Sequence, residues 1–154
     1  MTYLVVSAFL IGLVAGLRSL TAPAAVSWAV RLGWLHADSS LLAFWGYAAT
    51  PYVLSALAMG ELFADTLAVA PSRKAPPGFI TRIVTGGICG AVFGADGGDL
   101  AMGALVGVAG AIAGTLGGYE ARVRLARAVG KDLPVALIED AIAIGGAFLL
   151  VRMG

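Results

Sequence analysis

The chain has 154 residues, of which 60% are hydrophobic and only 12% are charged, whereas about a quarter of the residues of an ordinary soluble domain are charged. The mean hydropathy of +0.94 and the long uncharged runs exclude an ordinary soluble domain and indicate a membrane protein. The formal net charge of +1 argues against nucleic acid as a partner, because the ten Lys and Arg do not form the concentrated basic face that phosphate binding requires. We therefore expect a single transmembrane domain over residues 1–154 whose partner is the lipid bilayer.

The apolar runs predict helices, because they lack the two-residue alternation of barrel strands and because lipid requires every backbone polar group to be paired internally. The fold class is therefore all-α, a polytopic transmembrane helical bundle with about six membrane segments, one or two of them short or re-entrant. In chain order the segments cover about residues 2–17, 23–35, 40–70, 78–95, 100–119 and 134–152.

Local signals refine three of these segments. A single helix over residues 40–70 would measure about 45 Å, longer than a hydrocarbon core of roughly 30 Å, so we expect a break at Pro51 that leaves an interfacial piece before it. Thr21 is the expected cap of the second helix, and Asp99 that of the fifth. The fifth helix should continue beyond Tyr119 into the polar stretch EARVRLARAVGKD.

The distribution of bases predicts the orientation. Arg73 and Lys74 lie in the loop on one side, together with the bases of residues 122–131, whereas the opposing turn contains Asp96 and Asp99 and no base. Since Lys and Arg collect in cytoplasmic loops, six crossings would place both termini outside.

Glycines recur at three- or four-residue spacing in the fourth and fifth predicted helices. Without side chains at these positions, two helix backbones can approach closely in a membrane. The short link favours a tight Gly-zipper hairpin of these two helices; the alternative is that one glycine face forms a homo-oligomer interface, and both can hold. The glycines are Gly86, Gly90 and Gly94, followed by Gly103, Gly107, Gly110 and Gly114.

Four carboxylates inside apolar segments are the strongest candidates for function. Glu61 and Asp65 are four residues apart and share a helix face, while Glu139 and Asp140 are adjacent and point about 100° apart. A charge at the centre of a bilayer costs roughly 2.5 to 3.5 kcal/mol even on lenient scales. Their depth estimates are similar, so we expect the third, fourth and sixth helices to bring them into one interior pocket.

Two bases, Arg82 and Arg18, fall at a similar depth and are the candidate counter-charges. One interpretation is a buried ion-pair network that sets helix register. The other is that two bases cannot neutralise four acids, so that the remainder bind a cation or a proton. Neither a histidine nor a thiol accompanies the acids, so an oxygen-rich site of this kind would favour hard ions over soft ones. We expect no cofactor, and the sequence names no particular metal.

A resemblance to a known protein family covers nearly the whole chain. Three motifs carry it: GLRSLTAPAAVSWA, GELFADTLAVAPSRKAPPGFITRIVTGGICGA and LIEDAIAIGGAF. The chain resembles a widespread bacterial family of small, glycine-rich integral membrane proteins (domain of unknown function 4126). Glu61 and Asp65 leading into the Pro-Ser-Arg of residues 71–73 fit the family pattern, while Thr66 stands where a Lys is common. The resemblance implies a multi-pass protein of the bacterial inner membrane and brings no established activity.

The chain has a looser similarity to cation exchangers with inverted halves and paired acidic helices, although Ala64 stands in place of their motif glycine. The function expected from the sequence is a transporter or channel for a cation or a proton-coupled small solute, in an oligomer. The alternative is a structural or lipid-organising oligomeric protein in which the same charges form an ion-pair network. We expect no enzyme, since there is no nucleophile-base pair or metal-ligand motif.

Overall fold

The computed structural model describes residues 2–37, 42–66 and 76–153, and within these ranges the chain forms helices and no strand. The all-α prediction is confirmed. The elements are α1 (Thr2–Leu17), α2 (Thr21–Arg31), the short 3-10 helix η1 (Ala43–Gly46), α3 (Thr50–Thr66), α4 (Pro76–Asp96), α5 (Leu100–Val129) and α6 (Asp132–Met153).

Several boundaries follow from the local signals. The break at Pro51 is confirmed, because α3 begins at Thr50 and places the proline in its first turn, where the missing N–H removes no helical hydrogen bond. Asp99 caps α5, with its Oδ1 accepting from the backbone N of Met102 at 2.9 Å. The same helix runs past Tyr119 to Val129, as expected, and ends at Gly130, whose φ of 75° is the left-handed conformation that favours glycine.

Two predicted boundaries were wrong. The second helix occupies Thr21–Arg31 rather than residues 23–35, and Leu20 stands at its N-cap position without a side-chain capping bond. The last helix begins at Asp132, because Pro134 is tolerated within a first turn and does not have to begin the helix.

Three of the described helices, α4, α5 and α6, are long and apolar enough to cross a membrane. A fourth apolar segment, Tyr3–Leu17 of α1, is shorter. These helices support a membrane protein. At 30 residues, α5 is about 45 Å long and exceeds a hydrocarbon core of roughly 30 Å, so its polar C-terminal part extends beyond that core when the helix crosses upright.

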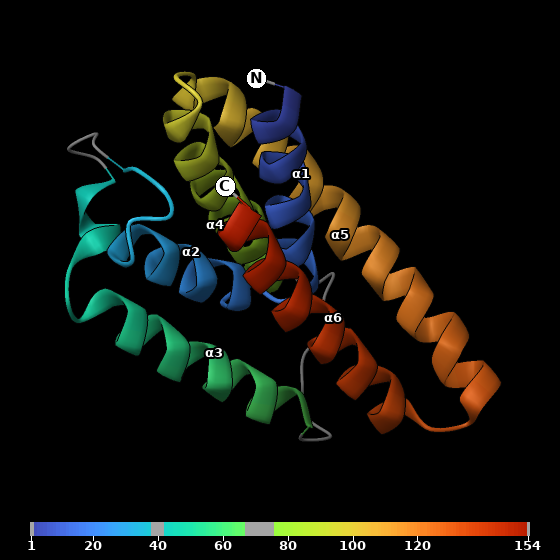
Figure 1. Cartoon of the computed structure of the whole chain (residues 1–154). Helices are drawn as coiled ribbons and strands as arrows, with labels where there is room; N and C mark the ends of the chain where they lie inside the picture. Colours follow the sequence, from blue (N-terminus) through green and yellow to red (C-terminus); the bar gives the residue numbers. More distant parts are fainter. Residues whose placement is uncertain (1, 38–41, 67–75, 154) are drawn as a thin grey trace.

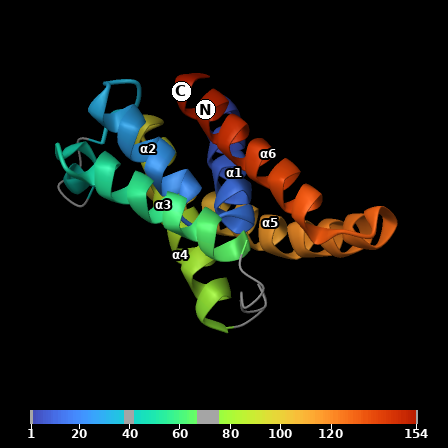
Figure 2. The same ribbon diagram turned by 90° about the horizontal axis from the view of Figure 1, so that it is seen from below.

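The helices form two groups. In Figure 1, α1, α4 and α5 pack together and α6 lies across them, while α2 and α3 run beside one another at one side. The view from below in Figure 2 again places α2 and α3 side by side and shows the α5–α6 hairpin extending away from them. The N-terminus lies beside the α4–α5 turn, and the C-terminal end of α6 points the same way.

Glycines line the contact between α4 and α5. A Cβ placed on Gly107 would lie 2.3 Å from the carbonyl oxygen of Gly86, and one on Gly103 would lie 2.3 Å from that of Gly90. A Cβ on Gly94 would lie 2.5 Å from the carbonyl oxygen of Asp99. Because these neighbours are backbone atoms, no side-chain movement makes room, and only glycine permits this separation of the two helices.

The other glycines of α5 face α1. A Cβ on Gly110 would lie 2.1 Å from the carbonyl oxygen of Phe9, and one on Gly114 would lie 2.2 Å from that of Leu13. From the opposite side, a Cβ on Gly12 would meet the carbonyl oxygen of Gly107 at 2.1 Å. The second glycine face of α5 is thus covered by another helix of the same chain.

Candidate functional site

The turn between α1 and α2 holds a buried arginine against α6. Arg18 is 1% exposed and follows α1 directly, with its backbone N bonded to the carbonyl of Val14 at 2.8 Å. Its Nε donates to Asp140 Oδ1 at 2.7 Å, and its Nη2 donates to the same oxygen. The Asp140 side chain is 13% exposed. This ion pair is largely removed from solvent. The attraction within such a pair offsets the cost of desolvating two charges only when the geometry of the pair is good.

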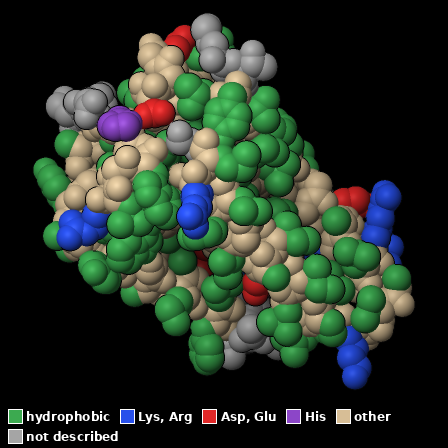
Figure 3. Space-filling view, viewed as in Figure 1, with side chains coloured by type: hydrophobic (Ala, Val, Ile, Leu, Met, Phe, Trp, Pro, Cys, Tyr) green, Lys and Arg blue, Asp and Glu red, His purple; other side chains and the backbone are tan. Residues whose placement is uncertain are grey.

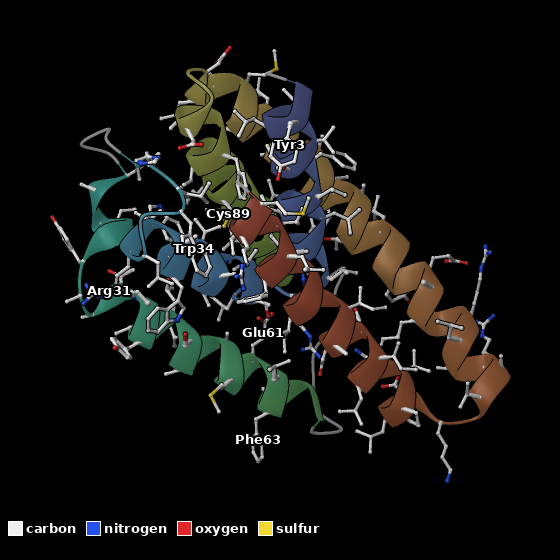
Figure 4. The ribbon with its side chains drawn as sticks, in the orientation of Figure 1. Tyr3, Arg31, Trp34, Glu61, Phe63 and Cys89 are labelled. Carbon is white, nitrogen blue, oxygen red and sulfur yellow. The ribbon has the colours of Figure 1, made fainter. Side chains whose placement is uncertain are left out.

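The same turn is held from the other side by Glu61 of α3. Ser19 donates to Glu61 Oε1 from its backbone N at 2.9 Å and from its Oγ at 2.5 Å. The backbone N of Leu20 donates to Oε2 at 2.9 Å. In Figure 4, Glu61 points inward from α3, whereas Phe63 on the same helix points away from the protein.

This carboxylate supplies what the start of α2 lacks. Leu20 has no side-chain oxygen that could accept a hydrogen bond at the N-cap position. Both oxygens of Glu61 serve as acceptors, and its negative charge lies at the positive end of the α2 dipole. Glu61 therefore joins α3 to the beginning of α2 as a cap contributed from a distant part of the chain.

Glu139 belongs to a separate group with the end of α5. Arg122 Nη1 lies 3.7 Å from Glu139 Oε2. Arg122 also donates to both oxygens of Asp132, from Nε at 2.9 Å and from Nη2 at 2.6 Å. The side chains of Arg122 and Glu139 are 17% and 10% exposed.

Adjacent positions on α6 thus face different helices. Consecutive residues of a helix point about 100° apart, and here Asp140 reaches α1 while Glu139 reaches α5. Arg122 and Glu139 also line a cavity of about 130 Å³ between α1, α5 and α6, whose other walls are mostly apolar.

The predicted cluster of four acids is only partly described. Arg82 is buried on α4 at 7% exposure, whereas the side chain of Asp65 lies outside the described part of the structure. Among the residues that are described, no three His, Cys, Asp or Glu side chains come together as metal ligands. Glu61 and Asp140 both contact the turn of residues 18–20, whereas Glu139 lies near Arg122 of α5.

The expected convergence of the ionisable side chains of the third, fourth and sixth helices stays a prediction, because the side chain of Asp65 lies outside the described part of the structure. The described part of α4 packs against α1, α5 and α2, and none of its Cα atoms lies within 8 Å of one in α3 or α6. The glycine face of α4 packs against α5 and α1.

Sequence reasoning missed Arg122 and Ser19 as partners of the acids. Arg122 had a signal, because it stands eight residues before Gly130 and Glu139 stands eight residues after Lys131, which places the two opposite one another in an antiparallel hairpin. Ser19 had none, since its approach to Glu61 depends on how α3 packs on the turn.

Comparison with protein-family models, with curated proteins and with solved structures gave no match for this chain.

Proposed function

We propose that this chain is a structural, lipid-organising protein of the membrane, in which partly buried carboxylates hold the helices together. The observation that carries the proposal is that Asp140 pairs with Arg18, Glu139 lies 3.7 Å from Arg122, and Glu61 accepts hydrogen bonds at the start of α2. Besides the two predicted bases, Arg122 and the N–H groups at the start of α2 contact the acids, and Arg122 is shared between Glu139 and Asp132.

The energetics favour this role. An unpaired charge is costly in a membrane, and each hydrogen bond to a carboxylate contributes about 1.5 to 3 kcal/mol. The turn of residues 18–20 is joined to α6 through Arg18 and to α3 through Glu61. The two interactions together set the position of α2, whose 11 residues are too few to cross a bilayer.

Cation or proton transport is the second candidate function. It is favoured by the cavity of about 130 Å³ beside Glu139 and Arg122, which is large enough to hold water. A protonatable acid next to water is the arrangement that proton relays use in membranes.

Glu139→Gln separates the two functions. The variant, the wild type and a Glu120→Gln control are reconstituted in liposomes and assayed for proton, Na⁺ and K⁺ flux, and their unfolding is measured in detergent. Glu120 suits the control because it is a glutamate on α5 whose side chain is 55% exposed. The structural role predicts no flux above that of empty liposomes and a loss of stability in Glu139→Gln alone. Wild-type flux that Glu139→Gln abolishes without a change in stability would replace it with transport.

The remaining parts of the proposal rest on the sequence and on packing. Six membrane segments would add α1, α3 and, as a short or re-entrant segment, α2 to the three long apolar helices. The glycine contacts of α5 support a Gly-zipper, and the motifs around Arg18, Glu61 and Glu139 support membership of the glycine-rich bacterial family and residence in the inner membrane. Exposed apolar side chains on α3 and α6 (Figure 3) suit either lipid or a second copy in a homo-oligomer.

A further inference from the structure

A groove of about 400 Å³ lies between α2, α3 and α6. Its volume falls within the range of about 300 to 1,000 Å³ that is typical of small-molecule sites. Small side chains of α2, among them Ala24 and Ala25, form one wall. Met59 of α3 and Phe148 of α6 line the other two and are 69% and 50% exposed. The groove is therefore mainly apolar, and its rim belongs to a surface that would face hydrocarbon in a membrane.

Two polar groups in the walls are already paired with each other. Trp28 Nε1 donates to Ser55 Oγ at 3.1 Å, and both residues line the groove. An indole nitrogen can only donate, so this bond uses its one hydrogen and joins the α2 wall to the α3 wall. The interior of the groove thus offers a ligand chiefly apolar contact, which suits a hydrocarbon chain.

One end of the groove carries a positive charge. Trp34 lines this end from the segment after α2, lies between α2 and α6 in Figure 4, and packs edge-on against Phe148 with ring centroids 6.4 Å apart. The exposed Arg152 of α6 lies over the same indole, with its Cζ 6.0 Å from the ring centroid. Within the described part of the chain, no carboxylate forms an ion pair with Arg152. The groove therefore combines an apolar interior with a cation that is available to an anion.

The position of this charge matches the level of lipid headgroups. Arg152 is in the last turn of α6, a helix long and apolar enough to cross a membrane, and arginine and tryptophan side chains at helix ends favour the membrane interface. From that end the groove follows α6 back from Val151 to Ile144, about 10 Å at 1.5 Å per residue. Its charged end would thus lie among headgroups and its apolar part in the hydrocarbon.

We propose that this groove binds an anionic phospholipid, with one acyl chain along the apolar walls and the phosphate at Arg152. A guanidinium binds a phosphate through two parallel N–H···O bonds, and the indole of Trp34 favours a cation over its face. The inference rests on the proposed lipid-organising function and deepens it by naming the class of lipid and its site.

The test compares two lipids with the same acyl chains. Purified full-length protein in detergent is incubated with equal amounts of dioleoyl phosphatidylglycerol, which is anionic, and dioleoyl phosphatidylcholine, which is zwitterionic. The retained lipids are counted by native mass spectrometry. One arginine near the membrane surface favours anionic lipid by roughly 5-fold, so the wild type should retain phosphatidylglycerol over phosphatidylcholine by at least this factor. Arg152→Gln should lower the ratio by roughly 5-fold.

Arg31→Gln is the matched control for the charge. Arg31 is also an exposed arginine at a helix end, but it does not line the groove and points away from α6 in Figure 4. The ratio in this variant should stay near that of the wild type.

A second pair of variants tests the apolar walls. Ala25→Phe places a ring in the groove and should lower the retention of both lipids. Ala56→Phe is its control, because Ala56 is exposed on α3 outside the groove, and it should retain both lipids as the wild type does.

Four results would overturn the site: equal retention of the two lipids by the wild type, an unchanged ratio in Arg152→Gln, an equal fall in Arg31→Gln, or undiminished retention in Ala25→Phe. A dimer in the wild-type spectra that Ala25→Phe abolishes would also overturn it, because a second copy of the chain would then fill the groove. If Ala25→Phe does not fold, the two arginine variants decide the question. Ion flux through the wild type would overturn the structural role and leave the lipid ratio unaffected, so the two failures can be told apart.

Discussion

Asp140→Asn is the sharpest test of the buried ion pair, because it removes the charge of the side chain and keeps its size. Arg18 is 1% exposed and would be left beside a neutral amide, whose oxygen can still accept from Nε and Nη2 but no longer carries the charge that balances the guanidinium. Breaking a buried pair by removing one partner destabilises a protein by about 3 to 5 kcal/mol. We expect a loss of that size in the free energy of unfolding.

The assay is a denaturant titration of the purified protein in mixed micelles, followed by circular dichroism and extrapolated linearly. A double variant, Arg18→Leu with Asp140→Leu, removes both charges of the pair. Its loss of unfolding free energy should be much smaller than the sum of the losses in the two single leucine variants, since neither charge of the pair is left without the other. Arg124→Gln is the control, because its partner Glu120 is on the same helix and the two side chains are 75% and 55% exposed; its loss should be at most about 0.5 kcal/mol.

Two results would refute this reasoning. A loss below about 1 kcal/mol in Asp140→Asn would show that Arg18 is solvated or neutralised by other groups. Additive losses in the double variant would show that the two side chains act independently and that their contact does not stabilise the fold.

Two further predictions concern packing and capping. Gly107→Ala places a Cβ 2.3 Å from the carbonyl oxygen of Gly86 and should lower the free energy of unfolding by about 1 to 3 kcal/mol. The control is Gly117→Ala on the same helix, whose Cβ meets nothing within 4 Å; this variant should be neutral or stabilising by up to about 1 kcal/mol. Equal losses of stability in the two variants, measured by the same denaturant titration, would contradict this prediction. Glu61→Gln removes the charge and one of the two acceptors for Ser19 and the start of α2 and should lower stability by about 1 to 3 kcal/mol, so an unchanged midpoint would show that the cap contributes nothing.

The helices themselves could be predicted from local sequence. The first helix occupies the predicted residues 2–17, Pro51 breaks the third segment, and Asp99 begins α5. Each of these signals acts within one or two turns of its own residue, through a missing N–H or a capping oxygen. Apolar length likewise indicated a membrane protein before any packing was known.

The partners of the charged side chains could be predicted only in part. Arg18 was expected to neutralise an acid, yet the choice of Asp140 over Glu61 depends on where α6 crosses α1. The role of Glu61 as a distant cap was not foreseen, because a helix start with an apolar residue such as Leu20 does not reveal which carboxylate will reach it.

Sequence alone determined that this chain is a set of apolar helices with glycines and carboxylates at particular positions. Tertiary structure decided that α5 uses Gly103 and Gly107 against α4 but Gly110 and Gly114 against α1, and that Glu139 and Asp140 turn to different arginines. The physical reason is one of range. Helix formation depends on neighbours within a few residues, whereas the partner of a glycine face or a charge depends on which distant backbone approaches it.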